Sequence, residues 1–175
     1  QGYKLWFYES NSNVPPWPTF TNNTLDGFEP RILMWGAWYE QATGFLYYQI
    51  SEWASAATAW GINDKFTKPG DGVLIYPGNH DGSGHVGSPA DVAIDGPVPS
   101  YRLKVVRAGL QDWALFRLAD RLGLGSVVRT EVAKAYRQMG ACLSTGCAKP
   151  EFYWKTDEVL LNTIRHTVLE AIATH

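Results

Sequence analysis

The sequence has no excess of charge of either sign and no long apolar run. Its 15 basic and 17 acidic side chains leave a formal net charge of −2. Nucleic acids and anionic membrane surfaces attract proteins with excess positive charge, so this composition predicts neither partner. No apolar run reaches the roughly 20 residues that cross a bilayer, which excludes an ordinary transmembrane helix.

Cysteine is also scarce, with only Cys142 and Cys147, which lie five positions apart in a glycine-containing stretch. A short loop of this kind closes as a disulfide where the two Cα atoms come close enough. Asn22 begins an Asn-Asn-Thr sequence in a loop, which is an N-glycosylation acceptor. Both features are typical of secreted proteins, so we expect an extracellular location. The chain has no initiator Met and opens almost directly in a strand, which predicts a processed or truncated product.

The sequence has little that resembles a metal or cofactor site. It has no phosphate-binding glycine motif and no Ser-His-Asp order of catalytic residues. His80, Asp81 and His85 form a chemically sensible ligand set for zinc or iron. They lie in a glycine-rich loop without a rigid scaffold or the spacing of a calcium-binding EF-hand loop. We therefore interpret this segment as a solvated loop and predict no metal and no cofactor.

Aromatic residues are abundant, with eight Trp, nine Tyr and seven Phe in 175 residues. Aromatic rings fill protein cores, and they also stack on flat apolar surfaces of ligands. The hydrophobic fraction of 45% is that of a globular domain with a substantial core. Trp35, Trp38 and Trp113 fall inside predicted helices and are assigned to the core, which leaves the rings at strand ends as candidates for ligand binding.

Strands and helices alternate along the chain, which predicts βαβ units and a parallel sheet. Loops that leave the carboxyl ends of the strands are long, whereas the connection at Thr43 and Gly44 into the second strand is short. Barrel enzymes show this asymmetry because their sites are built from the βα loops. Three strands cannot close a barrel, so we expect the other strands from a missing N-terminal segment or from another chain. The predicted strands are 3–8, 45–50 and 72–76, and the predicted helices are 29–41, 100–123, 127–139 and 156–174.

Three blocks of sequence carry a resemblance to a known family. The first lies in residues 31–53 and contains RIL, WGAWY and GFLYY before Trp53. The second is GDGVLIYPG at residues 70–78, and the third combines PVPSYRL and RAGLQDW within residues 97–113. In this order and spacing, they resemble the C-terminal part of the catalytic domain of glycoside hydrolase family 123 and its uncharacterised relatives, over about residues 3–122.

The resemblance implies an α/β fold. Residues 1–123 would supply the last strands and helices of a (β/α)8 TIM-type barrel, from about its sixth strand to its eighth helix. Residues 124–175 would form a C-terminal helical extension packed on that barrel.

The resemblance also implies a retaining, substrate-assisted β-N-acetylgalactosaminidase, in which an Asp stabilises an oxazoline and the adjacent Glu is the general acid. That pair lies on an earlier barrel strand. The one Asp-Glu dipeptide here, Asp157-Glu158, begins the last predicted helix, where negative charge is favourable. We therefore expect no catalytic residue in this chain. Ser51 and Ala108 depart from the Asn and Asp common in the family, which leaves the sugar undetermined.

We expect the substrate-binding residues at the rim formed by the carboxyl ends of the strands. Glu9 and Glu52 follow the first two strands, and they either form a carboxylate pair of the glycosidase kind or contact sugar hydroxyls. Arg31 and Arg102 either pair with these carboxylates or anchor loops. Aromatic rings at the rim would stack on a glycan or pack beneath the loops. These rings are Tyr8, Tyr48, Trp53 and Tyr76.

Two functions are consistent with these patterns. One is a part of a glycoside hydrolase that supplies the substrate-positioning rim. The alternative is a non-catalytic extracellular structural or carbohydrate-binding protein with a barrel-derived fold. An Asp-Glu pair at the end of an upstream strand would favour the enzyme.

Overall fold

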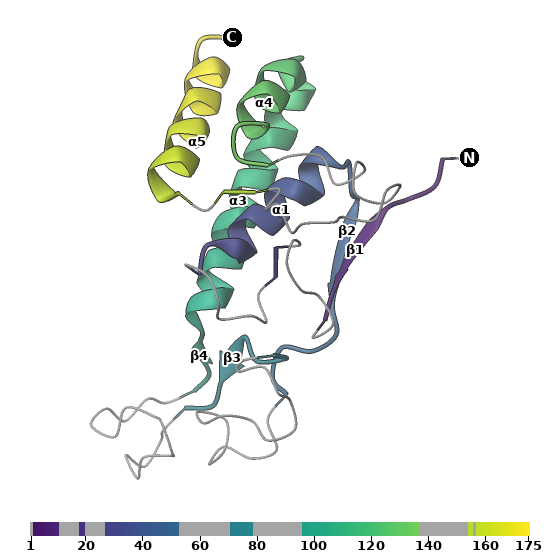
Figure 1. The fold of residues 1–175 in the computed structure, drawn as a ribbon, viewed down its shortest axis with the longest axis vertical. Helices are drawn as coiled ribbons and strands as arrows, with labels where there is room; N and C mark the ends of the chain where they lie inside the picture. Colours follow the sequence, from purple (N-terminus) through teal and green to yellow (C-terminus); the bar gives the residue numbers. More distant parts are fainter. Residues whose placement is uncertain are drawn as a thin grey trace, which may run out of the picture.

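The computed structural model describes residues 2–10, 18–19, 27–52, 71–78, 96–136, 154–155 and 157–175. These residues form a mixed α/β structure in which the helices pack side by side, with short strands beside α1 and at the start of α3 (Figure 1). In chain order the elements are β1 (Trp6–Glu9), α1 (Glu29–Tyr39), β2 (Gly44–Tyr47), β3 (Ile75–Tyr76), β4 (Val98–Pro99), α3 (Tyr101–Arg121), α4 (Gly125–Val132) and α5 (Glu158–Ala173).

Strands β1 and β2 pair in parallel, in a register that places Trp6 opposite Gly44 and Glu9 opposite Tyr47. Helix α1 connects them, so the predicted βαβ unit is confirmed. Successive side chains of a strand point to opposite faces of the sheet. On one face Phe7, Phe45 and Tyr47 pack against a cluster that includes Leu33 and Met34 of α1.

The other face of this small sheet is open. Trp6, Tyr8 and Leu46 have relative exposures of 59%, 53% and 50%. Large apolar side chains clustered on one face of a sheet normally lie against another part of a protein. The sheet therefore has one covered face and one uncovered face among the described residues.

The third predicted strand pairs differently from the expectation. We expected residues 72–76 to join a parallel sheet, but β3 has two residues and runs antiparallel to β4, with Ile75 opposite Pro99. Pro77 and Gly78 end β3, since proline cannot donate to a ladder. The Ser100 N–H then donates to the Leu74 carbonyl at 2.8 Å, so β4 leads directly into α3. The described strands thus form two two-stranded sheets, and the closed barrel stays a prediction.

Side-chain caps stand at the starts of two helices. The Ser100 side chain accepts a hydrogen bond from the Leu103 N–H at the start of α3. Asp157 does the same for Leu160 at the start of α5. Such caps satisfy a backbone donor that has no partner within the helix.

The main core joins α1, α3, α4 and α5. Trp35 and Trp38 are buried, as predicted, and both meet the ring of Phe116 edge-on, with centroids 5.1 and 5.3 Å apart. Val128 of α4 and Leu161 of α5 belong to the same cluster. The helices beyond residue 123 therefore share one core with those before it. Within the described ranges, no helix is both long and apolar enough to cross a membrane.

Candidate functional site

A polar cluster lies where β2 ends. The Tyr47 hydroxyl accepts a hydrogen bond from the Gly72 N–H and donates one to Asp71 Oδ1 at 3.2 Å. Asp71 is only 1% exposed, and its other carboxylate oxygen, Oδ2, is buried without a hydrogen-bond partner among the described residues. Tyr47 thus uses its one proton and holds the Asp71 carboxylate beside the end of the strand.

Tyr48 and Glu52 both lie close to Gly72. A Cβ atom added to Gly72 would lie 2.6 Å from the Tyr48 hydroxyl and 2.6 Å from the Glu52 Cβ, and this glycine has a φ of +69°. The Glu52 N–H donates to the Gly72 carbonyl at 2.8 Å. Only glycine fits this close approach without strain. Two of the predicted rim residues are therefore brought together, around a turn that places Asp71 next to them.

The surroundings of Tyr48 keep its hydroxyl protonated. Partial burial raises the pKa of the Tyr48 phenol well above its usual value, and the charge of Asp71 and a hydrogen bond to it raise that pKa further. The charges of Glu52 and Tyr8 also raise the pKa of Tyr48. Tyr48 as a whole is 36% exposed, so part of the residue is open to solvent.

Tyr76 lies on the neighbouring ladder. Its hydroxyl accepts a long hydrogen bond, 3.4 Å, from Arg102 Nη2, which also donates to the Val73 carbonyl at 2.8 Å. Arg102 lies in the first turn of α3 and thereby ties that helix to the β3 segment. Arg102 therefore anchors this segment. Anchoring was one of the two roles predicted for it, and pairing with Glu9 or Glu52 was the other.

Glu9 occupies a different environment from the one expected. It ends β1, at the predicted edge, but it is fully buried rather than exposed on an open rim. The Thr19 hydroxyl donates to Glu9, and the Thr19 N–H donates to Glu29 Oε2 at 3.0 Å. Glu9 thus helps to hold the chain near Thr19 against the start of α1, and a sugar contact by Glu9 stays a prediction.

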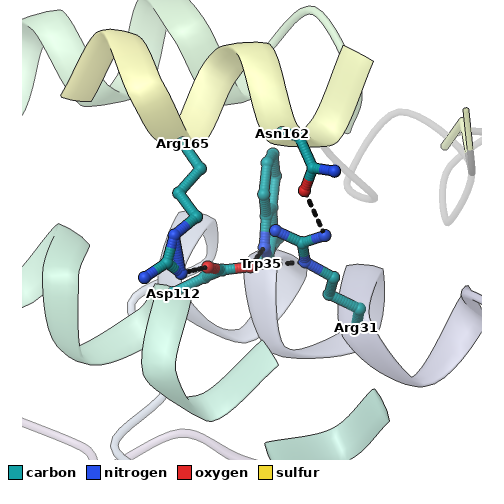
Figure 2. A network of polar contacts seen from close by, with 5 residues as sticks. All are labelled: Arg31, Trp35, Asp112, Asn162 and Arg165. Carbon is teal, nitrogen blue, oxygen red and sulfur yellow. Dashed lines mark hydrogen bonds and ion pairs between the residues drawn. The ribbon is translucent and has the colours of Figure 1, made fainter. Parts of the chain in front are cut away.

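Arg31 does not pair with Glu9 or Glu52 as one interpretation proposed. Its Nε donates to Asp112 Oδ2 at 2.6 Å, and its Nη1 donates to the Asn162 side-chain carbonyl at 3.0 Å. Figure 2 shows Arg31 and Arg165 reaching Asp112 from α1 and α5. Arg31 lies on the face of α1 that packs against α3 and α5, so it connects helices rather than facing the rim.

Several predicted positions lie outside the described residues. They comprise the stacking candidate, the glycosylation site, the disulfide pair and the histidine-containing loop, namely Trp53, Asn22, Cys142, Cys147, His80, Asp81 and His85. In the part of the chain that the structure describes, no group of three or more His, Cys, Asp and Glu side chains is placed to hold a metal ion.

Sequence reasoning missed Asp71 and Tyr47, which organise the cluster. Asp71 stands between two glycines just before a predicted strand, and this pattern places a carboxylate in a tight turn at a strand end. Tyr47 was passed over because a residue within an apolar run is expected to be core. Asp112 was missed as well, since an acidic residue within a long helix carries no distinguishing signal.

Comparison with known proteins gives a match in fold. No protein-family model matches the chain, and no curated protein matches it in sequence. Among solved structures, it is similar to a family 123 glycoside hydrolase from Clostridium perfringens, whose structural analysis concerned glycolipid glycan hydrolysis, with a TM-score of 0.58 and 17% identity. The match covers 95% of this chain and 26% of that protein. The chain therefore has the fold of about a quarter of a glycoside hydrolase of that family.

Proposed function

We propose that this chain is part of a carbohydrate-active enzyme similar to a retaining, substrate-assisted β-N-acetylgalactosaminidase. In this proposal it contributes the substrate-positioning rim and not the catalytic Asp-Glu pair. The observation that carries the proposal is the structural match to a family 123 glycoside hydrolase along nearly the whole chain. Since the match spans a quarter of that protein, the activity belongs to a complete protein of which this chain is one part.

The uncovered face of the β1–β2 sheet supports a place in a barrel. Helix α1 covers the face that bears Phe7 and Phe45, as the outer helices of a TIM barrel do. Trp6 and Leu46 would then point into the barrel, where side chains of the other strands would bury them. Those strands would come from the preceding part of the same protein or from another chain.

The polar cluster supports a role in holding a glycan. The carboxyl ends of parallel strands carry the sites of TIM-barrel enzymes, and Tyr48 follows β2 at that end. Its ring, with that of Tyr8, can stack on the apolar face of a sugar, while the Glu52 carboxylate can accept hydrogen bonds from hydroxyl groups. The proposed setting is extracellular, with a disulfide between Cys142 and Cys147 and a glycan on Asn22.

The chemistry of the reaction indicates which catalytic groups this chain does not supply. Substrate-assisted cleavage forms a bond from the acetamido oxygen to the anomeric carbon and breaks the bond to the leaving oxygen, which takes a proton from an acid. The Asp-Glu dipeptide of this chain is used elsewhere, because Asp157 caps α5. We therefore place the acid and the oxazoline-stabilising Asp outside this chain.

An activity assay on the complete protein tests this proposal. An aryl β-N-acetylgalactosaminide should be hydrolysed, and the configuration at the anomeric carbon should be retained in the first-formed product. Binding of N-acetylgalactosamine without turnover of any aryl glycoside would favour the non-catalytic alternative. Turnover by the 175-residue chain alone, abolished by Glu9→Gln or Glu52→Gln, would contradict the placement of the catalytic pair.

A further inference from the structure

A pocket lies at the amino end of β2, opposite the end of the strand that carries the rim. Thr43, which directly precedes β2, is part of its lining. The pocket has a volume of about 510 Å³, which is in the range of sites for small ligands. It opens between the last turns of α1 and α3 and the start of α4. Two arginines, Arg117 and Arg129, line it with a single carboxylate, that of Asp120, so positive charge is in excess.

The Asp120 carboxylate is already held within the fold. Its Oδ2 accepts a hydrogen bond from the Trp38 indole at 2.9 Å. Its Oδ1 lies 2.7 Å from the position of a Cβ atom added to Gly125, so the carboxylate packs against the first residue of α4. Negative charge is favourable at the start of a helix. One carboxylate placed in this way cannot neutralise both arginines of the pocket.

Arg129 is supported by two aromatic rings. Its guanidinium carbon lies 5.5 Å from the centroid of the Trp38 ring and 4.6 Å from that of Tyr39. Its Nη1 donates to the Tyr39 carbonyl at 3.2 Å, which is the one acceptor it uses in the part of the chain that the structure describes. The N–H groups of a guanidinium lie in its own plane, so ring contacts leave most of them for another partner.

Arg117 is held more loosely on the other wall. Its guanidinium carbon lies 5.8 Å from the centroid of the Trp113 ring. Its Nη1 is 3.5 Å from Asp120 Oδ2, and the Arg117 side chain is 50% exposed, so this ion pair contributes little. Arg117 can therefore turn to an incoming anion at small cost. Arginine binds carboxylates and phosphates with two parallel hydrogen bonds, which makes such groups the best chemical match for the pocket.

We propose that this pocket binds an oxyanion group, a phosphate or a carboxylate, between Arg117 and Arg129. Arg129 supplies donors that its aromatic neighbours keep in place, and Arg117 closes on the anion from α3. The site is separate from the glycan-binding rim, because it lies at the other end of β2. Its ligand is therefore additional to the glycan of the proposed function.

Anion titration of the complete protein tests this site. The probes are sodium phosphate and sodium acetate, titrated calorimetrically in a buffer without other oxyanions, at an ionic strength held constant with sodium chloride. We expect one-to-one binding of at least one probe with a Kd on the order of 1 mM, as a few charge-assisted hydrogen bonds to a small ion predict. Preference for phosphate identifies a phosphorylated ligand, and preference for acetate identifies a carboxylate.

Three variants assign the binding to the pocket. Arg117→Gln and Arg129→Gln should each weaken it about tenfold or more, as the loss of hydrogen bonds to a charged group predicts. Arg121→Gln is the matched control, since it removes the same charge from an exposed position in the last turn of α3 and should leave the Kd unchanged. Circular dichroism checks that each variant is folded. Because Arg129 packs on core rings, Arg117→Gln decides the result if Arg129→Gln does not fold.

The result does not depend on glycosidase activity. Absence of binding of both anions by the wild-type protein overturns the site, and so does an Arg117→Gln variant that binds as tightly as the wild type. Equal weakening by Arg117→Gln and Arg121→Gln also overturns it, since that would show a general effect of net charge. Loss in the two pocket variants alone supports the oxyanion site, whatever the complete protein does to a glycan.

Discussion

Asp112 of α3 receives the Arg31 Nε–H of α1 at 2.6 Å, and the Asp112 side chain has no exposed surface. The same carboxylate accepts from the Trp35 indole at 2.9 Å and from Arg165 of α5 at 2.8 Å (Figure 2). Hydrogen bonds between charged groups are stronger than those between neutral ones, and they fix geometry. One buried carboxylate therefore holds three helices in register.

Asp112→Ala should destabilise the fold severely. It would leave the Arg31 guanidinium buried without its counter-charge, and breaking a buried ion pair in this way costs about 3–5 kcal/mol. Urea unfolding followed by circular dichroism measures the loss. The control is Glu170→Gln, which removes an exposed pair with His166 and should change stability by less than about 1 kcal/mol. Equal effects of the two variants would contradict the assigned role of Asp112.

Gly109→Ala should destabilise the contact between α1 and α3. An added Cβ would lie 2.9 Å from the Arg31 carbonyl oxygen and 2.9 Å from the Met34 Cβ. Alanine is favoured over glycine within helices by about 1 kcal/mol, so a net loss of stability would mean that the clash costs more than this gain. We expect a net loss of about 1–3 kcal/mol by thermal or urea unfolding. Gly2→Ala meets no atom within 4 Å and should be neutral, whereas stabilisation by Gly109→Ala would refute this packing.

Tyr48→Ala in the complete protein should lower kcat/KM for an aryl β-N-acetylgalactosaminide without unfolding it. The partly exposed side chain would be lost, and positioning contacts of this kind affect the rate through orientation of the reacting groups. We expect a decrease on the order of tenfold or more, with an unchanged melting temperature. Trp53→Ala should act in the same direction. Tyr3→Ala, at a fully exposed ring, is the control, and a Tyr48 variant as active as this control would remove Tyr48 from the site.

Cys142 and Cys147 should be linked by a disulfide in protein from its native source. The short loop between them and the expected secretion both favour closure. Mass spectrometry without reduction, after alkylation of free thiols, distinguishes the two states. Two alkylated cysteines would argue against an oxidising compartment.

Chelation of divalent ions should leave both fold and sugar binding unchanged. His80, Asp81 and His85 stand in a glycine-rich stretch of sequence, from which we predict no metal site. Circular dichroism and sugar titration, each with and without a chelator, provide the measurement. Structure that is lost on chelation and restored by zinc or calcium would identify the three residues as ligands.

Local features of the sequence determined where α1, α3 and α5 begin. Ser100 and Asp157 each cap a helix with a side chain that reaches only three residues along the chain, and Pro30 stands in the first turn of α1. The alternation of strand, helix and strand was sufficient to predict the parallel pairing of β1 with β2. Signals of this kind are readable because they depend on neighbours within one turn or one connection.

Only the tertiary structure decided the partners of the polar side chains. Asp112 meets Arg31 because two helices cross closely at Gly109, and Asp71 meets Tyr47 because a turn at Gly72 returns to the end of β2. The antiparallel pairing of β3 with β4 was likewise not predicted, since two residues carry no periodicity. Periodicity and capping report which face or end of an element is buried, whereas ion pairs depend on how distant elements pack. The sequence therefore predicted which side chains follow the strands, and packing decided which of them lie together.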